Sequence, residues 1–190
     1  MNFRDLVKKN RSYRRFDEQF KIERETLVDL IGLARYAASG RNAQPLKYFI
    51  SNEAELNEQI FPTLAWAGYF PTWPGPEKGE RPSAYIVVLL DRSISENYFC
   101  DDGIAMQNIL LGATGEGLGG CIIRSINKPQ LSVCLNLSDR YEIIDVVALG
   151  KPVETVVITD LAKDGDIRYY RDENGKHYVP KRSLEELIIN

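Results

Sequence analysis

The segment from Asp102 to Thr114 restricts the possible folds of this chain more than any other, because it predicts a helix that is apolar on nearly every side. Its apolar positions are Ile104, Ala105, Met106, Ile109, Leu110, Leu111 and Ala113. A helix without a polar face is buried all round, so we expect it to be the core helix of the domain. The acidic pair at its start, Asp101 and Asp102, is expected to cap the first turn rather than to form a catalytic pair.

A continuous apolar run from Ala84 to Leu90 is rich in valine and isoleucine and predicts a central strand. Further strands are expected at 48–50, 121–123, 142–149 and 153–158, and at 167–170 and 177–179 around an Asn174-Gly175 hairpin turn. Helices are expected at 3–10, 27–38, 53–60 and 127–135, and after a capping box that begins at Ser183. This order lacks clean βαβ repeats, so the expected fold class is α+β, with a mixed, mostly antiparallel central sheet wrapped by helices.

Composition is that of one soluble globular domain, residues 1–190, because 44% of the residues are hydrophobic and 27% are charged. A net charge of −3 gives no general attraction to nucleic acid. No apolar run approaches the roughly 20 residues of a membrane span, and the N-terminus lacks the apolar core of a signal peptide. The three cysteines, Cys100, Cys121 and Cys134, follow no metal-ligand spacing, so we expect no metal site and buried thiols in a reducing cytoplasm.

The stretch from residue 63 to residue 82 is expected to be irregular, because prolines and glycines interrupt it throughout. It also carries four large aromatic residues: Trp66, Tyr69, Phe70 and Trp73. Two interpretations are equally favoured. The rings form either a hydrophobic cluster beneath a long loop or a lid that walls a flat ligand, in which case Trp66 and Tyr69 belong to a substrate pocket.

The run from Arg11 to Phe16 places three guanidinium groups and the Ser12 hydroxyl within six residues. Arginine presents five donors in a rigid fork that suits phosphate and carboxylate oxygens. Because Tyr13 and Phe16 alternate with the arginines, we expect this loop to be fixed to the core. A second segment, Ser39 to Pro45, also has the composition of a ligand loop.

Lys181 and Arg182 directly precede the helix that begins after Ser183. Basic side chains beside the free N–H groups of a helix N-terminus favour a phosphate site there. The only histidine, His177, lies on the predicted hairpin and is expected to be structural, which argues against Ser-His and Cys-His nucleophiles. The run from Gly115 to Gly120 matches GxGxxG, but a helix precedes it and a strand follows, which is the reverse of a dinucleotide-binding turn.

These motifs together resemble the FMN-dependent nitroreductase-like family. Its N-terminal signature, Arg-Ser-x-Arg-x-Phe, matches Arg11, Ser12, Arg14 and Phe16, and its second loop matches Ser39, Asn42, Gln44 and Pro45. The resemblance continues through Gly117–Cys121 to Leu149–Pro152 and so covers most of the chain. The family commonly has another arginine where this chain has Asn10, which leaves open which arginine meets the phosphate.

The resemblance implies a homodimer with two FMN sites at the subunit interface. Arg11, Ser12, Lys181 and Arg182 would hold the phosphate end, and Arg14 would stabilise the reduced ring electrostatically. Ser39, Asn42 and Gln44 would bound the ring from the partner subunit. Backbone groups near Arg124 and Ser125 would meet the N5 and O4 edge. No side chain is expected to act as a nucleophile or general base, because the flavin carries the chemistry.

The expected function is therefore transfer of electrons from NADH or NADPH, through FMN, to a nitroaromatic, a quinone or a similar small acceptor. Three alternatives stay open: FMN storage or sensing without turnover, an unusual FMN step such as dehalogenation or ring cleavage, and a phosphate-ligand protein without flavin.

Overall fold

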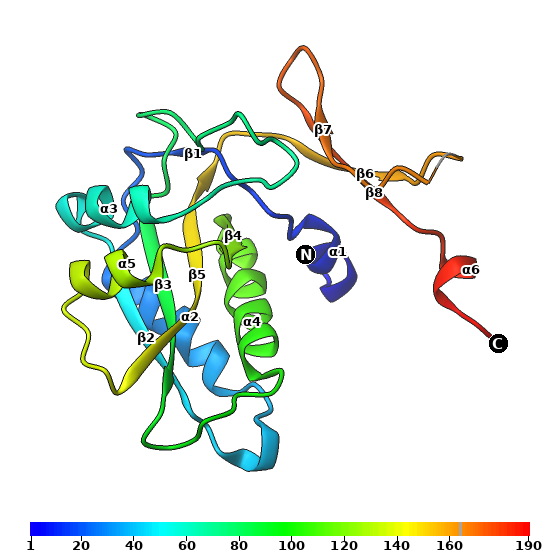
Figure 1. Cartoon of the computed structure of the whole chain (residues 1–190). Coiled ribbons are helices and arrows are strands. Elements are labelled where there is room, and N and C mark those ends of the chain that lie inside the picture. Colours follow the sequence, from blue (N-terminus) through cyan, green and yellow to red (C-terminus); the bar gives the residue numbers. More distant parts are fainter. Residues whose placement is uncertain (164) are drawn as a thin grey trace.

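The computed structural model describes residues 1–163 and 165–190. Its body is built on an antiparallel five-stranded sheet with the order β1-β5-β3-β2, in which β4 also pairs with β5 (Figure 1). The strand bounds are Phe16–Asp17 for β1, Leu46–Ser51 for β2, Ala84–Asp91 for β3, Gly119–Ile123 for β4 and Tyr141–Pro152 for β5. Every residue of β3 is buried, which confirms the predicted central strand.

The predicted break between two strands at residues 150–152 is wrong. Strand β5 continues to Pro152 because other strands supply backbone partners along this stretch: Phe16 of β1 pairs with Pro152, and Gly119 of β4 pairs with Gly150. The strand expected at 153–158 begins later, as β6 (Val156–Asp160).

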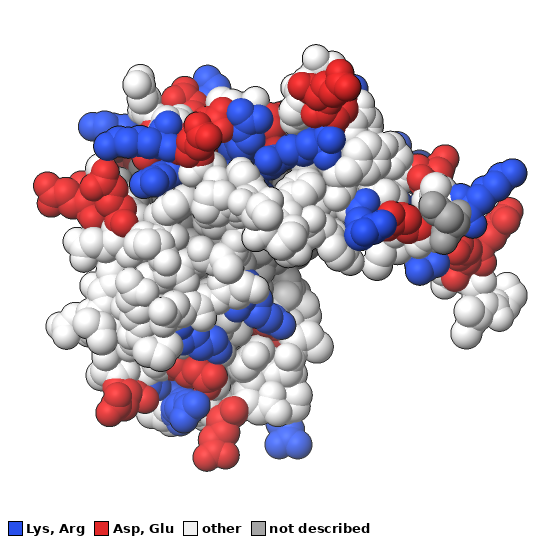
Figure 2. All heavy atoms as spheres, turned by 45° about the horizontal axis from the view of Figure 1, so that its top comes forward, with Lys and Arg blue, Asp and Glu red and all other residues white. Residues whose placement is uncertain are grey.

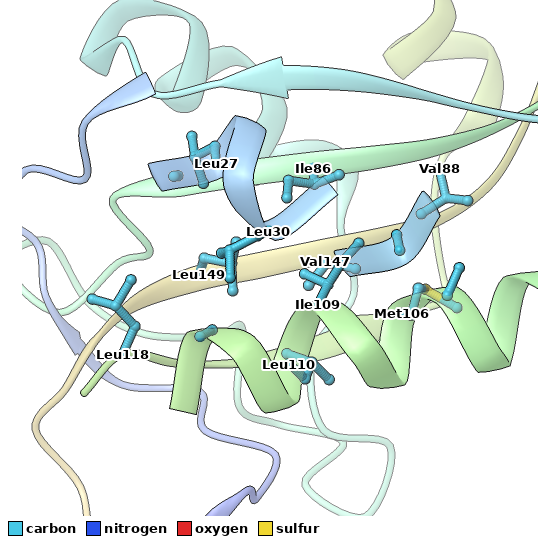
Figure 3. Close-up of a cluster of buried hydrophobic side chains, with 14 of the residues drawn as sticks. Leu27, Leu30, Ile86, Val88, Met106, Ile109, Leu110, Leu118, Val147 and Leu149 are labelled. Atoms are coloured by element: carbon cyan, nitrogen blue, oxygen red, sulfur yellow. The ribbon is translucent and has the colours of Figure 1, made fainter. Parts of the chain in front are cut away.

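Two helices cover one face of the sheet and form the first core. They are α2 (Arg24–Arg35) and the central helix α4 (Asp101–Gly115). Figure 3 shows leucines of α2, residues of α4 and the inward side chains of β3 and β5 meeting between these elements. Ile109 and Ala113 of α4 are fully buried, which confirms the predicted core helix, but Ile104 is 41% exposed, so the expectation that this helix is buried all round is wrong. The short helix α1 (Phe3–Lys9) precedes the arginine loop.

The opposite face carries a second core beneath α3 (Ala54–Ile60) and α5 (Lys128–Cys134). Alternate residues of β3 separate the two cores, with Ile86 and Val88 facing the first and Tyr85 and Val87 facing the second, as the two-residue period of a strand requires. A 3₁₀ turn, Phe61–Thr63, follows α3. The segment after it is irregular up to β3, as predicted.

The C-terminal part forms an arm that projects from the body (Figure 1). It contains a second, three-stranded sheet in which β8 (His177–Lys181) pairs parallel with β6 and antiparallel with β7 (Tyr170–Arg171). The hairpin prediction is confirmed, although its first strand is shorter than expected. The last helix, α6 (Leu184–Leu187), begins with the predicted capping box at Ser183.

Close backbone packing explains the glycine-rich run after α4. A Cβ on Gly120 would collide with the carbonyl oxygen of Ala148 on the neighbouring β5. Helix α4 precedes this run and β4 follows it, so the rejection of a dinucleotide-binding turn is confirmed.

The cysteines are free, but they are not all buried as expected. Cys121 is buried, Cys134 is half-buried, and Cys100 is exposed just before α4. Within residues 1–163 and 165–190, no helix has both the length and the apolar character needed to span a membrane.

Candidate functional site

The arginine loop lines a cavity of about 380 Å³ between α1, α4, β4 and the arm. The cavity brings together four of the predicted ligand residues, Arg11, Ser12, Arg14 and Lys181. Its remaining lining residues are Val7, Asn10, Gln107, Leu110, Ile122, Val156, Tyr169, His177 and Val179. The described lining thus contains three cationic side chains and no carboxylate. We call it the arginine cavity.

Arg11 is the side chain in this cavity that most needs a further partner. Its Nη2 donates to the carbonyl oxygen of Val7 at 3.1 Å, but its buried Nε has no hydrogen-bond partner among the described residues. Burial lowers the pKa of the Arg11 guanidinium, with a smaller opposing effect from Tyr13. An anion in the cavity would supply the missing acceptor and offset this desolvation.

Arg14 extends across the Tyr169 ring, with its guanidinium carbon 5.0 Å from the ring centre. Its Nη1 donates to the carbonyl oxygen of Ser12 at 3.3 Å. The ring quadrupole attracts a cation that lies over an aromatic face, and the outer N–H groups of the guanidinium remain available for hydrogen bonds to a ligand.

The backbone of the arginine loop is held by Glu154, a residue that sequence reasoning missed. Its carboxylate accepts from the backbone N–H of Arg14 and, at 3.2 Å, from that of Arg15. The Glu154 side chain is only 1% exposed and also meets Nη2 of Arg171 at 3.4 Å. About 140 residues separate Glu154 from the loop in the chain, so no local motif pointed to it.

His177 is 1% exposed and contributes its ring to the arginine cavity. Its ring packs edge-on against the Phe70 ring, with ring centres 5.9 Å apart. It also packs in a tilted arrangement against the Tyr169 ring, with ring centres 5.1 Å apart. Burial, reinforced by Arg14 and Arg171, lowers the pKa of His177 to about 4. The ring is therefore neutral at pH 7. Both of its nitrogens are buried without a partner among the described residues, so His177 is part of the cavity as well as of the packing.

The second predicted motif lies elsewhere in the chain, against the first turn of α4. The Ser39 hydroxyl donates to Asp101 Oδ2 at 2.6 Å, and Gly40 N–H donates to Asp101 Oδ1 at 2.8 Å. Ser39 Oγ in turn accepts from the backbone N–H of Gln44 at 2.9 Å. The predicted capping role of the acidic pair is wrong, because the N-cap is Cys100 and Asp101 binds the Ser39 loop instead. Both carboxylates nevertheless lie in the first turn, at the positive end of the helix, as predicted.

Residues 40–44 form a strained turn. The 3₁₀ turn Gly40–Asn42 is followed by a hydrogen bond of 3.2 Å from Gln44 Nε2 to the carbonyl oxygen of Asn42. Arg41, Asn42 and Gln44 all have positive φ angles, of 55°, 57° and 52°. A positive φ angle costs conformational free energy in residues other than glycine, and residues in such conformations cluster at ligand sites. The side chains of Asn42 and Gln44 are exposed, so they are presented outward.

A separate cavity of about 320 Å³ adjoins this turn and is lined by Ser39, Gln44, Tyr48 and Asp101, among others. Burial raises the pKa of Tyr48 to about 12, and Asp101 adds to the shift. The Tyr48 hydroxyl is therefore a neutral group at pH 7.

The side chain of Arg124 is bound to carboxylates, whereas the prediction for this third segment concerns backbone groups near Arg124 and Ser125 and stays a prediction. Arg124 Nε and Nη2 donate to Asp145 at 2.9 and 2.7 Å, and Nη2 also meets Asp102 at 2.5 Å. The hydrogen bonds to Asp145 raise the pKa of Arg124 most strongly. The carbonyl oxygen of Ser125 accepts from Ala65 N–H at 2.9 Å, which ties this segment to the second core.

The predicted halves of the site are therefore separated along α4. The Ser39 loop and Arg124 meet Asp101 and Asp102 in its first turn, whereas the arginine cavity reaches Gln107 and Leu110. At about 1.5 Å rise per residue, these positions lie roughly 8–13 Å apart along the helix axis.

The remaining residues predicted to belong to the site lie in different parts of the structure. Lys181 lines the arginine cavity, whereas Arg182 is exposed and its Nη1 lies 3.1 Å from Glu186 Oε1. Trp66 is 6% exposed and packs in the second core, which favours the cluster interpretation for that residue. Tyr69 is 44% exposed, and its ring lies 4.9 Å from that of Tyr169.

Comparison with known proteins places the chain among nitroreductases. The model described as the nitroreductase family matches residues 7–74 and 79–151. A nitrobenzene nitroreductase of Ectopseudomonas oleovorans is 26% identical over an alignment that covers 77% of this chain and 85% of that protein.

Solved structures show the same fold. A nitroreductase family protein of Clostridium novyi NT matches with a TM-score of 0.65 and 27% identity, covering 80% of this chain and 87% of that chain. An FMN-dependent nitroreductase of Clostridium difficile R20291 matches with a TM-score of 0.64 and 20% identity, covering 89% of this chain and 92% of that chain. Because the family model spans well over half of the sequence, the chain belongs to the nitroreductase family.

Proposed function

We propose that this chain is an FMN-dependent oxidoreductase that passes electrons from NADH or NADPH to a nitroaromatic, a quinone or a similar small acceptor. The observation that carries the proposal is the arginine cavity of a nitroreductase-family chain, in which Arg11 has a buried Nε without a partner among the residues that the structure describes.

The arginine cavity suits the phosphate end of FMN. Arg11 and Lys181 would neutralise the phosphate, and the Ser12 hydroxyl would add a neutral donor. No acidic side chain in the described lining opposes an anion. One compact cationic site of about 380 Å³ favours a single phosphate over the pyrophosphate of FAD. This assignment answers the question raised by Asn10, since it gives the phosphate contact to Arg11.

The ring end would lie beyond Arg14, whose guanidinium reaches across Tyr169. Bound FMN would supply the redox chemistry, accepting electrons from the nicotinamide donor and passing them to the acceptor. A fixed positive charge near the ring favours the negative charge that reduction creates, and this is the role we give Arg14. His177 is neutral and would add polar atoms without adding charge.

A homodimer would unite the two halves of the site. In one chain Asn42 and Gln44 are exposed in the loop held by the first turn of α4, and neither lines the arginine cavity. Large apolar side chains are exposed on α1, α6 and the C-terminus: Phe3, Val7, Leu184, Leu187, Ile188 and Ile189. Figure 2 shows a broad uncharged surface on the body and at the base of the arm. Pairing two copies would bury such surface and let each provide the Ser39 loop to the other's cavity.

Purified protein provides the first test of this function. We expect it to carry a flavin that is released on denaturation and has the mass of FMN. Under anaerobic conditions NADH or NADPH should bleach the flavin absorbance, and a nitroaromatic or quinone should restore it. Release of FAD, or absence of any flavin, would contradict the cofactor assignment. Bound FMN that no nicotinamide donor reduces would favour storage or sensing instead.

A further inference from the structure

We propose that a second cavity, beside α3, binds a small monocarboxylate with an apolar body. The cavity has a volume of about 610 Å³, within the range typical of small-molecule sites. Its lining comes from the loop between β1 and α2 (residues 18–23), from α3 and from the residues that lead into β3. It shares no lining residue with the arginine cavity. We call it the α3 cavity.

Three buried polar atoms in the α3 cavity lack hydrogen-bond partners within the described part of the chain. They are Arg81 Nε, Ser83 Oγ and Tyr85 Oη. Tyr85 is 0% exposed and Ser83 is 9% exposed. Arg81 and Ser83 lie in the bends that lead into β3, and Tyr85 is the second residue of that strand. All three residues line the α3 cavity.

Such a group of atoms calls for an acceptor, and the described part of the chain supplies none. Buried polar groups in native proteins almost always have partners, and an unpaired one costs free energy. The Arg81 Nε–H can only donate, and the two hydroxyls can donate as well. Burial raises the pKa of Tyr85, so its hydroxyl keeps its proton at neutral pH. A carboxylate, with two oxygens and about four lone-pair positions, matches several donors in one cavity.

Neighbouring polar groups do not act as acceptors for these three donors, because they form hydrogen bonds with one another. Asn57 Oδ1 accepts from the Ser51 hydroxyl at 2.7 Å, and Asn57 Nδ2 donates to the carbonyl oxygen of Ser83 at 2.8 Å. These bonds fix α3 against the strands and leave the Ser83 hydroxyl itself without a partner.

The rest of the lining determines the other properties of the ligand. Ile22, Phe61 and Pro82 provide apolar surface, and the Arg81 guanidinium carbon lies 4.2 Å from the centre of the Phe61 ring. Four carboxylates in the lining outnumber the two cationic side chains: the acidic residues are Glu18, Glu23, Glu53 and Glu58, and the basic ones are Lys21 and Arg81. This excess of negative charge opposes every anion, and it opposes dianions such as phosphates and dicarboxylates most. Among anions, a single carboxylate on an apolar body therefore fits best.

Calorimetric titration of the purified protein, with its cofactor bound, tests the proposal with two probes of nearly equal shape. These are 3-phenylpropanoate and its neutral analogue 3-phenylpropanamide. We expect the acid to bind at least tenfold more tightly than the amide, because hydrogen bonds to a charged group are the stronger ones. Equal binding of the two, or no binding of the acid at millimolar concentration, would overturn the proposal.

Two conservative variants then locate the site. Tyr85→Phe and Ser83→Ala should each weaken binding of 3-phenylpropanoate about tenfold, which corresponds to about one hydrogen bond to a carboxylate. Neither should lower the melting temperature of the probe-free protein, since each removes a hydroxyl that has no partner in the described chain. Ser51→Ala is the matched control: it removes a hydroxyl bonded to Asn57, so it should lower the melting temperature and leave probe binding nearly unchanged.

The opposite pattern would assign these hydroxyls a structural role through bound water. In that case Tyr85→Phe and Ser83→Ala would lower the melting temperature and leave affinity for the probe unaltered, which would overturn the proposal. An Arg11→Gln variant separates the two cavities, because it should retain binding of 3-phenylpropanoate whatever happens to the flavin. Loss of probe binding in that variant would place the probe in the arginine cavity and reject the α3 cavity as its site.

Discussion

The arginines of the predicted ligand segments occupy different chemical states in the folded chain. Arg124 is held by two carboxylates, and Arg182 is exposed and paired with Glu186. Arg11 is half-buried and retains a partnerless Nε within the described residues. An arginine that is already paired gains little from a ligand anion, whereas an unpaired buried one gains the most. This difference ranks Arg11 first for the phosphate.

Replacing Arg11 tests that ranking. Arg11→Gln should weaken FMN binding at least about tenfold, because it removes a charge-assisted hydrogen bond of about 1.5–3 kcal/mol. Arg182→Gln serves as the control and should change the dissociation constant only slightly, since Arg182 does not line the arginine cavity. Fluorescence titration of the apoprotein measures both constants. A larger loss in the Arg182 variant would reverse the assignment.

His177 makes stability depend on pH in a defined window. Its pKa in the folded chain is about 4, below the ordinary value of 6.5. Between these values the unfolded chain binds more protons, so the free energy of unfolding should fall as pH decreases from 6.5 towards 4. His177→Phe keeps a ring at this position and should have a flatter profile. Denaturant melts between pH 5 and 6.5 measure the slope, and equal slopes in the two proteins would contradict the low pKa.

Among the elements, the first turn of α4 organises the predicted ligand segments. Asp101 binds the Ser39 loop, and Asp102 joins Asp145 in binding Arg124. The Asp145 side chain is 0% exposed and that of Asp102 is 8% exposed. Two buried carboxylates beside one guanidinium are stable only while the cation is present.

Removing that cation should therefore be costly. Arg124→Leu should lower the free energy of unfolding by about 3–5 kcal/mol, because it leaves buried carboxylates without their partner. Arg92→Leu is a matched control, because Arg92 is about as exposed as Arg124 (59% against 66%) but pairs at 2.8 Å with Glu142, whose side chain is 34% exposed rather than buried, so its loss should cost at most about 1 kcal/mol. Urea unfolding of the two variants compares the losses. Equal losses would show that the pair of aspartates needs no cation.

The irregular segment 63–82 should separate into a packing part and a surface part. Trp66→Ala should lower the free energy of unfolding by about 3–5 kcal/mol, because it empties a site in the second core. Tyr69→Ala should leave the unfolding transition almost unchanged and should alter the relative rates with nitroaromatics and quinones. Thermal melts and steady-state rates distinguish these effects. Unchanged acceptor preference in the Tyr69 variant would remove this residue from the substrate pocket.

At the scale of the whole molecule, the separation of the two motifs makes the dimer proposal testable by mixing. Arg11→Ala and Asn42→Ala homodimers should each bind FMN poorly, because each carries one lesion in both shared sites. When the two variants are unfolded and refolded together, random pairing should give about half mixed dimers. In each mixed dimer one site collects both lesions and the other collects none, so flavin binding should partly return. Mixed dimers without recovery would show that one chain supplies both residues.

The sequence by itself determined most of the regular elements, because their signals are local, but not β1 or the end of β5, which depend on strands that pair across the sheet. The apolar periodicity of α4, the valine-rich run of β3, the Asn174-Gly175 turn and the Ser183 capping box each depend on residues within a few positions of one another. The motif pair at Arg11 and Ser39 indicated the nitroreductase family in the same way, since two short patterns at a characteristic separation need no contact information.

Only the tertiary structure decided which of these residues are available to a ligand. Glu154 reaches the arginine loop across about 140 residues, and Asp101 reaches Ser39 across 62. Arg11 Nε and Tyr85 Oη have no hydrogen-bond partner among the described residues. This too can be recognised only from the folded structure, in which their neighbours are placed. Burial and pairing depend on segments brought together by packing, and a local pattern carries no information about distant partners. The sequence therefore determined the family and most of the elements, and the packing of the chain determined the cavities.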